Sequence, residues 1–206
     1  MVMKGVSFLA NIASIETIIN NLERLSNHVK TYNTGSYPAF FLQLHTPLHI
    51  QDILEMKLSD FYYWEDGMIR LLPEILYGDE IINLDAEGRK EFAWYALQRI
   101  PVRETKAAVL DDWLCVNKQG KQLQMQGYRK MLERASSELG FKNNYNVGYL
   151  HSLYGYLEIA LGKKTVAEVA SEYRVTRYYL LNRVFRGMEI QYVDSVIQQV
   201  ANIKET

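Results

Sequence analysis

The sequence contains a single cysteine, Cys115, and this scarcity excludes two structural classes. One cysteine cannot form a disulfide framework, and it cannot supply a zinc site built from several cysteines. The four histidines, at positions 28, 45, 49 and 151, lack the spacing of metal ligands, so we expect no metal and no cofactor. A lone cysteine suits a reducing compartment, and we therefore expect a cytoplasmic protein.

Long apolar runs are also missing. No run approaches the roughly 20 residues that a membrane span needs, and the N-terminus lacks a secretory pattern. We therefore expect no membrane partner. Hydrophobic residues make up 48% and charged residues 23% of the 206 positions, as in ordinary globular proteins, and this length can bury a core of its own.

Positive and negative side chains nearly balance, since the net charge is −1, but they are unevenly distributed along the chain. Residues 1–100 hold 8 basic and 13 acidic side chains, residues 101–186 hold 14 and 8, and residues 187–206 hold 1 and 3. A basic block of this kind could bind phosphate, although such an asymmetry can also be incidental.

The apolar spacing predicts a mainly α-helical fold with a small antiparallel β-sheet insertion. A small sheet of two or three strands is predicted near residues 60–84, with turns at Gly67 and Gly78 and an interruption at Pro73. The candidate strand segments are Phe61–Trp64, Met68–Leu72, Ile75–Tyr77 and Glu80–Leu84. Helices are expected over Ser14–Tyr32, Ala39–Leu44, His49–Lys57, Ala86–Ile100, Gln124–Leu139, Val147–Leu161 and Gln191–Ile203, with Ala107–Val116 helical or partly extended.

The stretch Thr165–Phe185 is typical of a DNA-binding helix-turn-helix unit. Val169 and Ala170 would form the inner face of its first helix, and Thr176 can cap its second. Arg174 stands in the turn, where a glycine is usual. The alternative is a pair of amphipathic helices that only pack together. In the DNA-binding interpretation, four side chains point outward: Arg177, Tyr178, Leu181 and Asn182.

Two further stretches resemble segments of the tyrosine recombinases, the phage integrase family. LQLHTPLHIQDILEMKLSDF, Leu42–Phe61, is similar to the segment that carries the family's first arginine, and HSLYGYLEIALG, His151–Gly162, is similar to its histidine–arginine signature. Their order and the hairpins between them agree over roughly residues 15–186. The resemblance implies a recombinase-like domain over 14–186, an N-terminal tail over 1–13 and a C-terminal helix within 187–206.

The family's chemistry needs two arginines on the scissile phosphate, a hairpin lysine, histidine-like proton carriers and a tyrosine nucleophile. This sequence retains His151, but it has no lysine between Lys57 and Lys90, where the hairpin lies. The other positions are degenerate: His49 and Tyr154 replace the arginines, Gly155 and Tyr173 replace histidines, and Asn182 stands near the nucleophile position. The resemblance thus implies a recombinase fold without enzyme activity.

We therefore expect a protein that binds double-stranded DNA, a transcriptional regulator such as a repressor, from a phage or other mobile element. Phosphate contacts are expected from the lysines and arginines of residues 118–134 and 163–186, and base contacts from the helix pair. The candidate DNA-binding residues are Lys118, Lys121, Arg129, Lys130, Lys163, Lys164, Arg174, Thr176, Arg177, Tyr178 and Arg183. In the alternative interpretation these are plain solvated charges.

Two other functions stay open. The chain could be an active recombinase with a displaced nucleophile, Tyr178 or Tyr179, or an interaction module that has lost DNA binding. The segment Gln191–Ile203 has an apolar stripe that could pack onto a second copy and form a homo-oligomer, or cover its own core.

Overall fold

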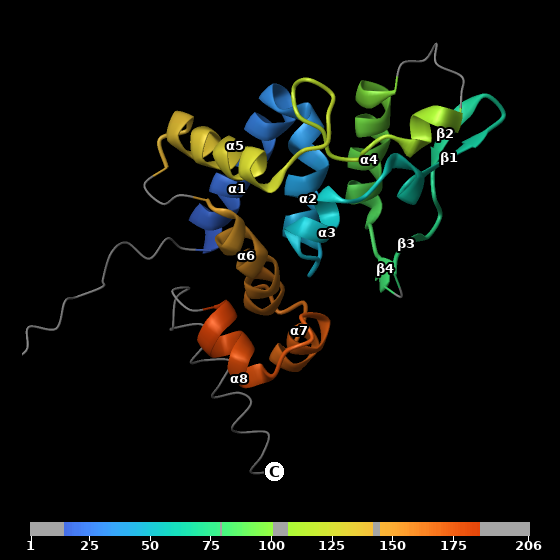
Figure 1. Ribbon diagram of the computed structural model, residues 1–206. Coiled ribbons are helices and arrows are strands. Elements are labelled where there is room, and N and C mark those ends of the chain that lie inside the picture. The colour runs from blue at the N-terminus through green and yellow to red at the C-terminus, as the bar shows by residue number, and fades with distance from the viewer. Residues whose placement is uncertain (1–14, 79, 101–106, 142–144, 186–206) are drawn as a thin grey trace, which may run out of the picture. The chain divides into compact units, whose positions relative to one another are not determined.

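The computed structural model describes residues 15–78, 80–100, 107–141 and 145–185. The chain forms two compact units. The larger unit is Arg24–Tyr154, and the described part of the smaller unit consists of residues 15–23 and 155–185. The expected fold class, mainly α with small antiparallel sheets, is confirmed (Figure 1). The expected tail 1–13 and C-terminal helix lie outside the described residues.

Helix α2 is the centre of the larger unit. Every side chain from Tyr37 to Gln43 is buried, because this segment is apolar on nearly all sides and cannot face water. The neighbouring helices present apolar faces to it. The helices up to this point of the chain are α1 Ile15–Tyr32, α2 Tyr37–His45, α3 Ile50–Leu54, α4 Ala86–Arg99, α5 Met125–Glu138 and α6 Val147–Ala160. Three 3₁₀ turns lie at Thr34–Ser36, Leu58–Asp60 and Ala107–Asp111.

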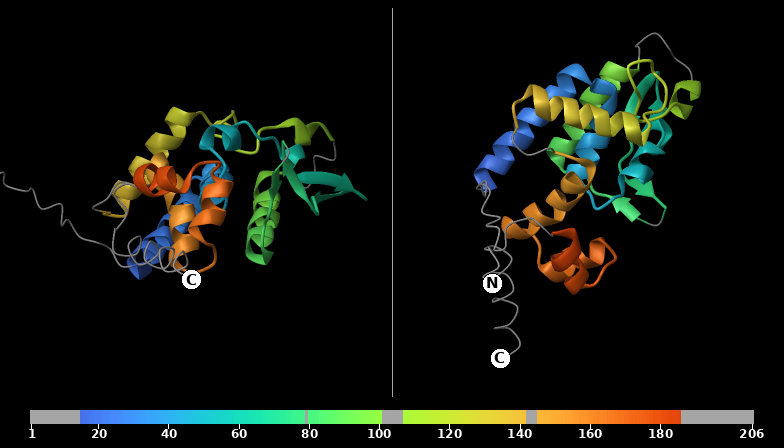
Figure 2. Two further views of the ribbon diagram at one scale, coloured as in Figure 1. Left: turned by 90° about the horizontal axis from the view of Figure 1, so that it is seen from below. Right: turned by 60° about the vertical axis from the view of Figure 1, so that its left-hand side comes forward.

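The strands form two separate two-stranded sheets, so the prediction of one sheet is wrong. Strand β1 (Tyr62–Glu65) pairs with β2 (Met68–Leu71), and β3 (Ile75–Tyr77) pairs with β4 (Glu80–Ile82), both antiparallel. Pro73 stands between the two hairpins and has no N–H to continue a ladder. Helix α4 contacts β2 and lies alongside the first hairpin (Figure 2).

The expected helix His49–Lys57 is shorter than predicted, and Ala107–Val116 is only partly helical, as one of its two expected forms, because these two stretches pair with each other. Helix α3 ends at Leu54, and the chain beyond it pairs with the segment that follows the 3₁₀ turn Ala107–Asp111. The N–H of Leu58 donates to the Asp112 carbonyl (2.9 Å), and the N–H of Leu114 donates to the Met56 carbonyl (2.8 Å). Tertiary pairing therefore overrides the helical periodicity of both stretches.

The smaller unit contains the predicted helix pair. Helix α7 runs over Val166–Glu172, and α8 over Arg177–Tyr179 continues into a π-helical turn, Leu180–Val184. The second helix of the expected pair therefore ends in a π-helical turn instead of continuing as an α-helix. The N–H of Phe185 donates to the Leu180 carbonyl five residues earlier (2.9 Å), and this wide turn leaves both side chains buried.

A buried amide connects three helices of the larger unit. The Nε2 of Gln43 in α2 donates to the carbonyl of Val147 at the start of α6 (2.8 Å), and its Oε1 accepts from the Tyr128 hydroxyl in α5 (2.9 Å). Gln43 and Tyr128 are both fully buried. Removing the amide would leave the buried Tyr128 hydroxyl without its partner, which costs about 1–3 kcal/mol, and would also remove the part-buried bond to the Val147 carbonyl.

We expect Gln43→Met to lower the free energy of unfolding by about 2–4 kcal/mol, because it removes both hydrogen bonds at nearly constant volume. Gln126→Met, on the exposed face of α5, is the matched control and should change stability by less than about 0.5 kcal/mol. Urea unfolding followed by circular dichroism measures both. Equal stability of the two variants would contradict the role given to Gln43.

Candidate nucleic-acid interface

The larger unit contains an open cavity of about 490 Å³ where three helices meet. Its wall combines the start of α3, one face of α5 and the start of α6. The Oδ1 of Asn146 accepts from the N–H of Tyr149 (3.0 Å), as a helix cap does, and so defines the start of α6. The lining residues are His49, Ile50, Gln51, Met125, Arg129, Glu133, Asn146, Val147 and Gly148.

His49 and His151 lie against each other beside this cavity. Their rings are stacked, with centroids 5.0 Å apart and planes 28° from parallel. Burial, followed by the neighbouring His49, lowers the pKa of His151 to about 4, although a hydrogen bond to the Leu48 backbone opposes the shift. His151 is therefore neutral at neutral pH.

The degenerate positions of the larger unit do not provide the charges that hold a reacting phosphate. His49 stands at the first arginine position, and its imidazole lacks the planar five-donor fork of a guanidinium. Tyr154 is only 6% exposed, so its side chain belongs to the interior. Within the described ranges, no three His, Cys, Asp or Glu side chains are grouped as metal ligands would be.

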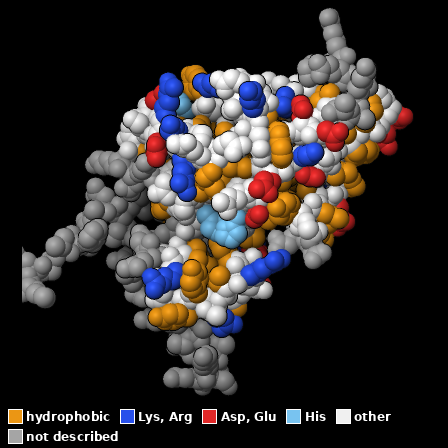
Figure 3. All heavy atoms as spheres, in the orientation of Figure 1, with side chains coloured by type: hydrophobic (Ala, Val, Ile, Leu, Met, Phe, Trp, Pro, Cys, Tyr) orange, Lys and Arg blue, Asp and Glu red, His pale blue; other side chains and the backbone are white. Residues whose placement is uncertain are grey.

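Candidate phosphate-binding cations of the larger unit lie on α5 and on the turn before it. Arg129 and Lys130 are exposed on α5, and neither forms an ion pair with another described residue. Lys118 and Lys121 are exposed on a turn shaped by the Asn117 Oδ1, which accepts from the N–H groups of Gln119 (2.9 Å) and Lys121 (3.1 Å). Figure 3 shows blue side chains gathered over α5 and red ones toward the β1–β2 hairpin.

The helix pair of the smaller unit has the local geometry that its sequence predicts. Val169 and Ala170 are buried, and the Thr176 hydroxyl caps α8 by accepting from the N–H of Tyr179 (3.1 Å). Arg174 has φ of 53°, the left-handed conformation in which glycine is usual. The predicted inner face of the first helix and the predicted Thr176 cap are thus confirmed.

The outward face of α8 and of the π-helical turn that continues it, together called the α8 face, combines aromatic and cationic side chains. Tyr178 is 77% exposed and Tyr179 51% exposed. Arg177 and Arg183 are exposed, and neither forms an ion pair with another residue in the described part of the chain. Asn182, also exposed, donates from Nδ2 to the Tyr178 carbonyl (2.9 Å). This surface leaves two guanidinium groups available to an external anion.

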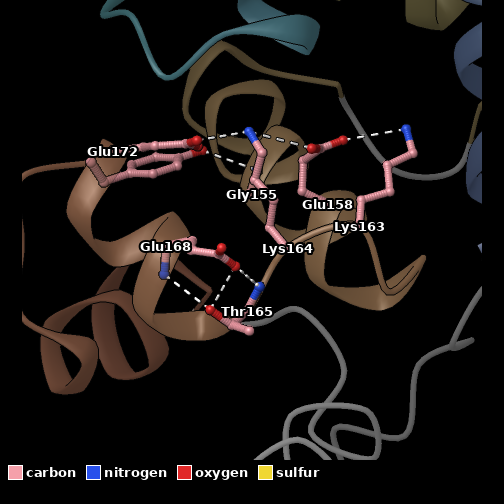
Figure 4. Close-up of polar contacts among 8 residues, drawn as sticks. Gly155, Glu158, Lys163, Lys164, Thr165, Glu168 and Glu172 are labelled. Carbon is pink, nitrogen blue, oxygen red and sulfur yellow. Dashed lines mark hydrogen bonds and ion pairs between the residues drawn. The ribbon is translucent and has the colours of Figure 1, made fainter.

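Lys163 and Lys164 differ from these arginines, because both form ion pairs within the unit. The Nζ of Lys164 lies 2.7 Å from a carboxylate oxygen of Glu172 and 3.4 Å from one of Glu158. Lys163 lies 3.3 Å from the other Glu158 oxygen (Figure 4). Their charges are partly neutralised within the protein, which makes them weaker candidates for DNA contact than Arg177 and Arg183.

Tyr173 occupies the space that the small Gly155 leaves open. The N–H of Gly155 donates to the Tyr173 hydroxyl (3.2 Å), and the two positions at which the family has histidines are therefore in contact. A Cβ added at Gly155 would lie 2.7 Å from Val169 Cγ1 and 2.9 Å from Tyr173 Cε2. The structure has no room for the family's histidine at position 155 while Tyr173 keeps this position.

We expect Gly155→Ala to lower the free energy of unfolding by about 1–3 kcal/mol, because α6 and α7 would have to separate. Gly127→Ala is the matched helical control. Its new Cβ would meet only Leu123 Cδ1 at an ordinary 3.5 Å, so it should stabilise the protein by about 0.5–1 kcal/mol. Opposite shifts of the thermal midpoint would confirm the close approach, and a stabilising Gly155→Ala would contradict it.

Several cavity residues were not predicted from the sequence: Gln51, Glu133, Asn146 and Gly148. For Asn146 a local signal exists, because an asparagine directly before an apolar helical stretch is a favoured N-cap. The sequence around the other three residues contains no pattern that would predict a site. They share one cavity only because α3, α5 and α6 converge there.

The chain is similar to a known protein in its fold and not in its sequence. No protein-family model matches the chain, and no curated protein matches it. A solved structure titled "Crystal structure of XerA recombinase" does match, with a TM-score of 0.62 over 100% of this chain and 67% of that chain. The identity is 13%. The chain therefore has a tyrosine-recombinase-like fold, and its likeness to XerA recombinase is one of structure. No helix in the described residues is long and apolar enough to cross a membrane.

Proposed function

We propose that this chain binds double-stranded DNA without cutting it and acts as a transcriptional regulator of a phage or other mobile element. The observation that carries the proposal is the α8 face in a recombinase-like fold. Arg177 and Arg183 are exposed there without an ion pair among the described residues, beside the exposed Tyr178. Such a face suits phosphate contact together with readout of base edges.

The larger unit would add contacts that do not depend on base sequence. Arg129 and Lys130 on α5, with Lys118 and Lys121 on the turn before it, present exposed cations. Contacts of this kind position a protein on the duplex and make its affinity depend on salt. The near-neutral total charge favours moderate affinity over the indiscriminate binding of a strongly basic protein.

The loss of catalysis in this proposal rests on the chemistry of the replaced side chains. Each missing phosphate-binding arginine would cost about 2–4 kcal/mol of transition-state stabilisation, or roughly 10²–10³ in rate. Tyr154 is buried, His49 has no guanidinium fork, and Asn182 has no nucleophilic group. Binding and cleavage use separable residues, so a surface for DNA can persist without the reaction.

We expect the Arg177→Ala, Arg183→Ala double variant to bind duplex DNA more weakly and with a shallower salt dependence. Two lost phosphate contacts should reduce the slope of log K against log salt by about 1.8. Lys90→Ala, an exposed lysine on α4 in the acidic half of the chain, is the control and should leave the slope unchanged. Fluorescence anisotropy at several salt concentrations measures this slope. If the double variant had the same slope as the parent protein, α8 would not be part of the DNA-binding surface.

We expect no covalent protein–DNA product on a nicked suicide substrate that traps phosphotyrosine intermediates. Denaturing gel electrophoresis detects such a product. If one formed and disappeared in Tyr178→Phe or Tyr179→Phe, the chain would be an active recombinase with a displaced nucleophile. If the chain bound no DNA at any salt concentration, the interaction-module alternative would hold instead.

A further inference from the structure

The β3–β4 hairpin is apolar on both of its faces. Ile75 pairs with Ile82, and these side chains are 1% and 6% exposed, so one face belongs to the core. Leu76 pairs with Ile81 on the opposite face, where they are 55% and 52% exposed. Successive strand residues point to opposite faces, and a solvated face normally carries polar side chains. Directly paired residues lie side by side, so Leu76 and Ile81 form one exposed apolar spot.

The charges around this spot exclude DNA as its partner. Residues 58–85 carry seven acidic side chains and a single basic one, Arg70. Arg70 is already bound to Glu65, with 2.6 Å between its Nε and a carboxylate oxygen. Glu74, just before β3, is exposed. A surface of this sign repels phosphate and attracts a partner that is both cationic and apolar.

The chain itself carries such a surface on the α8 face. Tyr178 and Tyr179 are large and exposed, and Arg177 and Arg183 are cations without an ion pair in the described residues. Hot spots of protein interfaces are enriched in tyrosine and arginine. We propose that the hairpin face of one copy, Leu76 and Ile81 with their acidic surroundings, binds the α8 face of a second copy.

This contact joins two different patches and is therefore head-to-tail. A pair of copies joined in this way still has one free hairpin and one free α8 face, so association continues into a ring or a chain. The area is small, so the contact is weak and salt-sensitive and becomes populated only at raised protein concentration. The proposal does not depend on DNA binding, because it concerns the free protein.

Sedimentation velocity of the full chain across the micromolar range tests it. At low salt we expect the weight-average mass to rise above the 24.0 kDa of one chain with increasing concentration, and to fall back at high salt. The double variant Leu76→Thr, Ile81→Thr should weaken association about tenfold or more. Met68→Thr, a 54% exposed residue on the other hairpin, is the control and should associate like the parent.

Mixing two defective variants distinguishes a head-to-tail contact from a symmetric one. The hairpin double variant retains α8, and the Arg177→Ala, Arg183→Ala variant retains the hairpin. Neither should associate alone, and their mixture should form dimers and no larger species. A parent protein that stays monomeric at every concentration overturns the proposal, as does association that survives in the hairpin variant. The hairpin variant should keep the parent's DNA affinity because it loses no cation, so either result leaves the proposed function standing.

Discussion

The candidate site of the larger unit depends on the two hydrogen bonds of the buried Gln43 side chain. Its amide satisfies the Tyr128 hydroxyl and the Val147 carbonyl at once, and thereby connects α2 to α5 and to the start of α6. Arg129 and Gly148 directly follow these two partners in sequence, and both line the cavity. A fully satisfied buried polar group specifies one arrangement of its neighbours, because any slip leaves a polar atom unpaired in a low-dielectric interior.

The ion pairs show which lysines and arginines are bound within the protein and which can bind an external anion, and the net charge does not show this. Lys164 shares the carboxylates of Glu158 and Glu172, whereas Arg177 and Arg183 have no ion pair among the described residues. The acidic hairpins and the basic helices also differ in what they can bind. Phosphate is attracted to one group and repelled by the other, so DNA and the acidic hairpin of a second copy would compete for the same basic surface at α8.

Local chemistry accounts for what the sequence predicted well. A threonine cap at Thr176 and the glycine-containing turn between the first two strands are each determined by neighbouring residues, and the structure shows both. The features that were missed depend on distant partners. Helix α3 ends early because Met56 and Leu58 pair with the segment around Asp112, and the ion pairs of Lys164 require the fold that brings Glu172 beside it. No spacing rule within a single segment contains that information.

Selection of bound fragments from native genomic DNA tests the central claim, DNA binding without cleavage, most directly. The purified chain is incubated with the fragments at two salt concentrations, and the recovered DNA is sequenced and examined on a denaturing gel. The account predicts that a small set of fragments is enriched, that recovery falls at the higher salt, and that every fragment is intact and free of linked protein. Recovery without enrichment and without salt dependence would contradict DNA binding, and cut or protein-linked fragments would contradict the loss of catalysis.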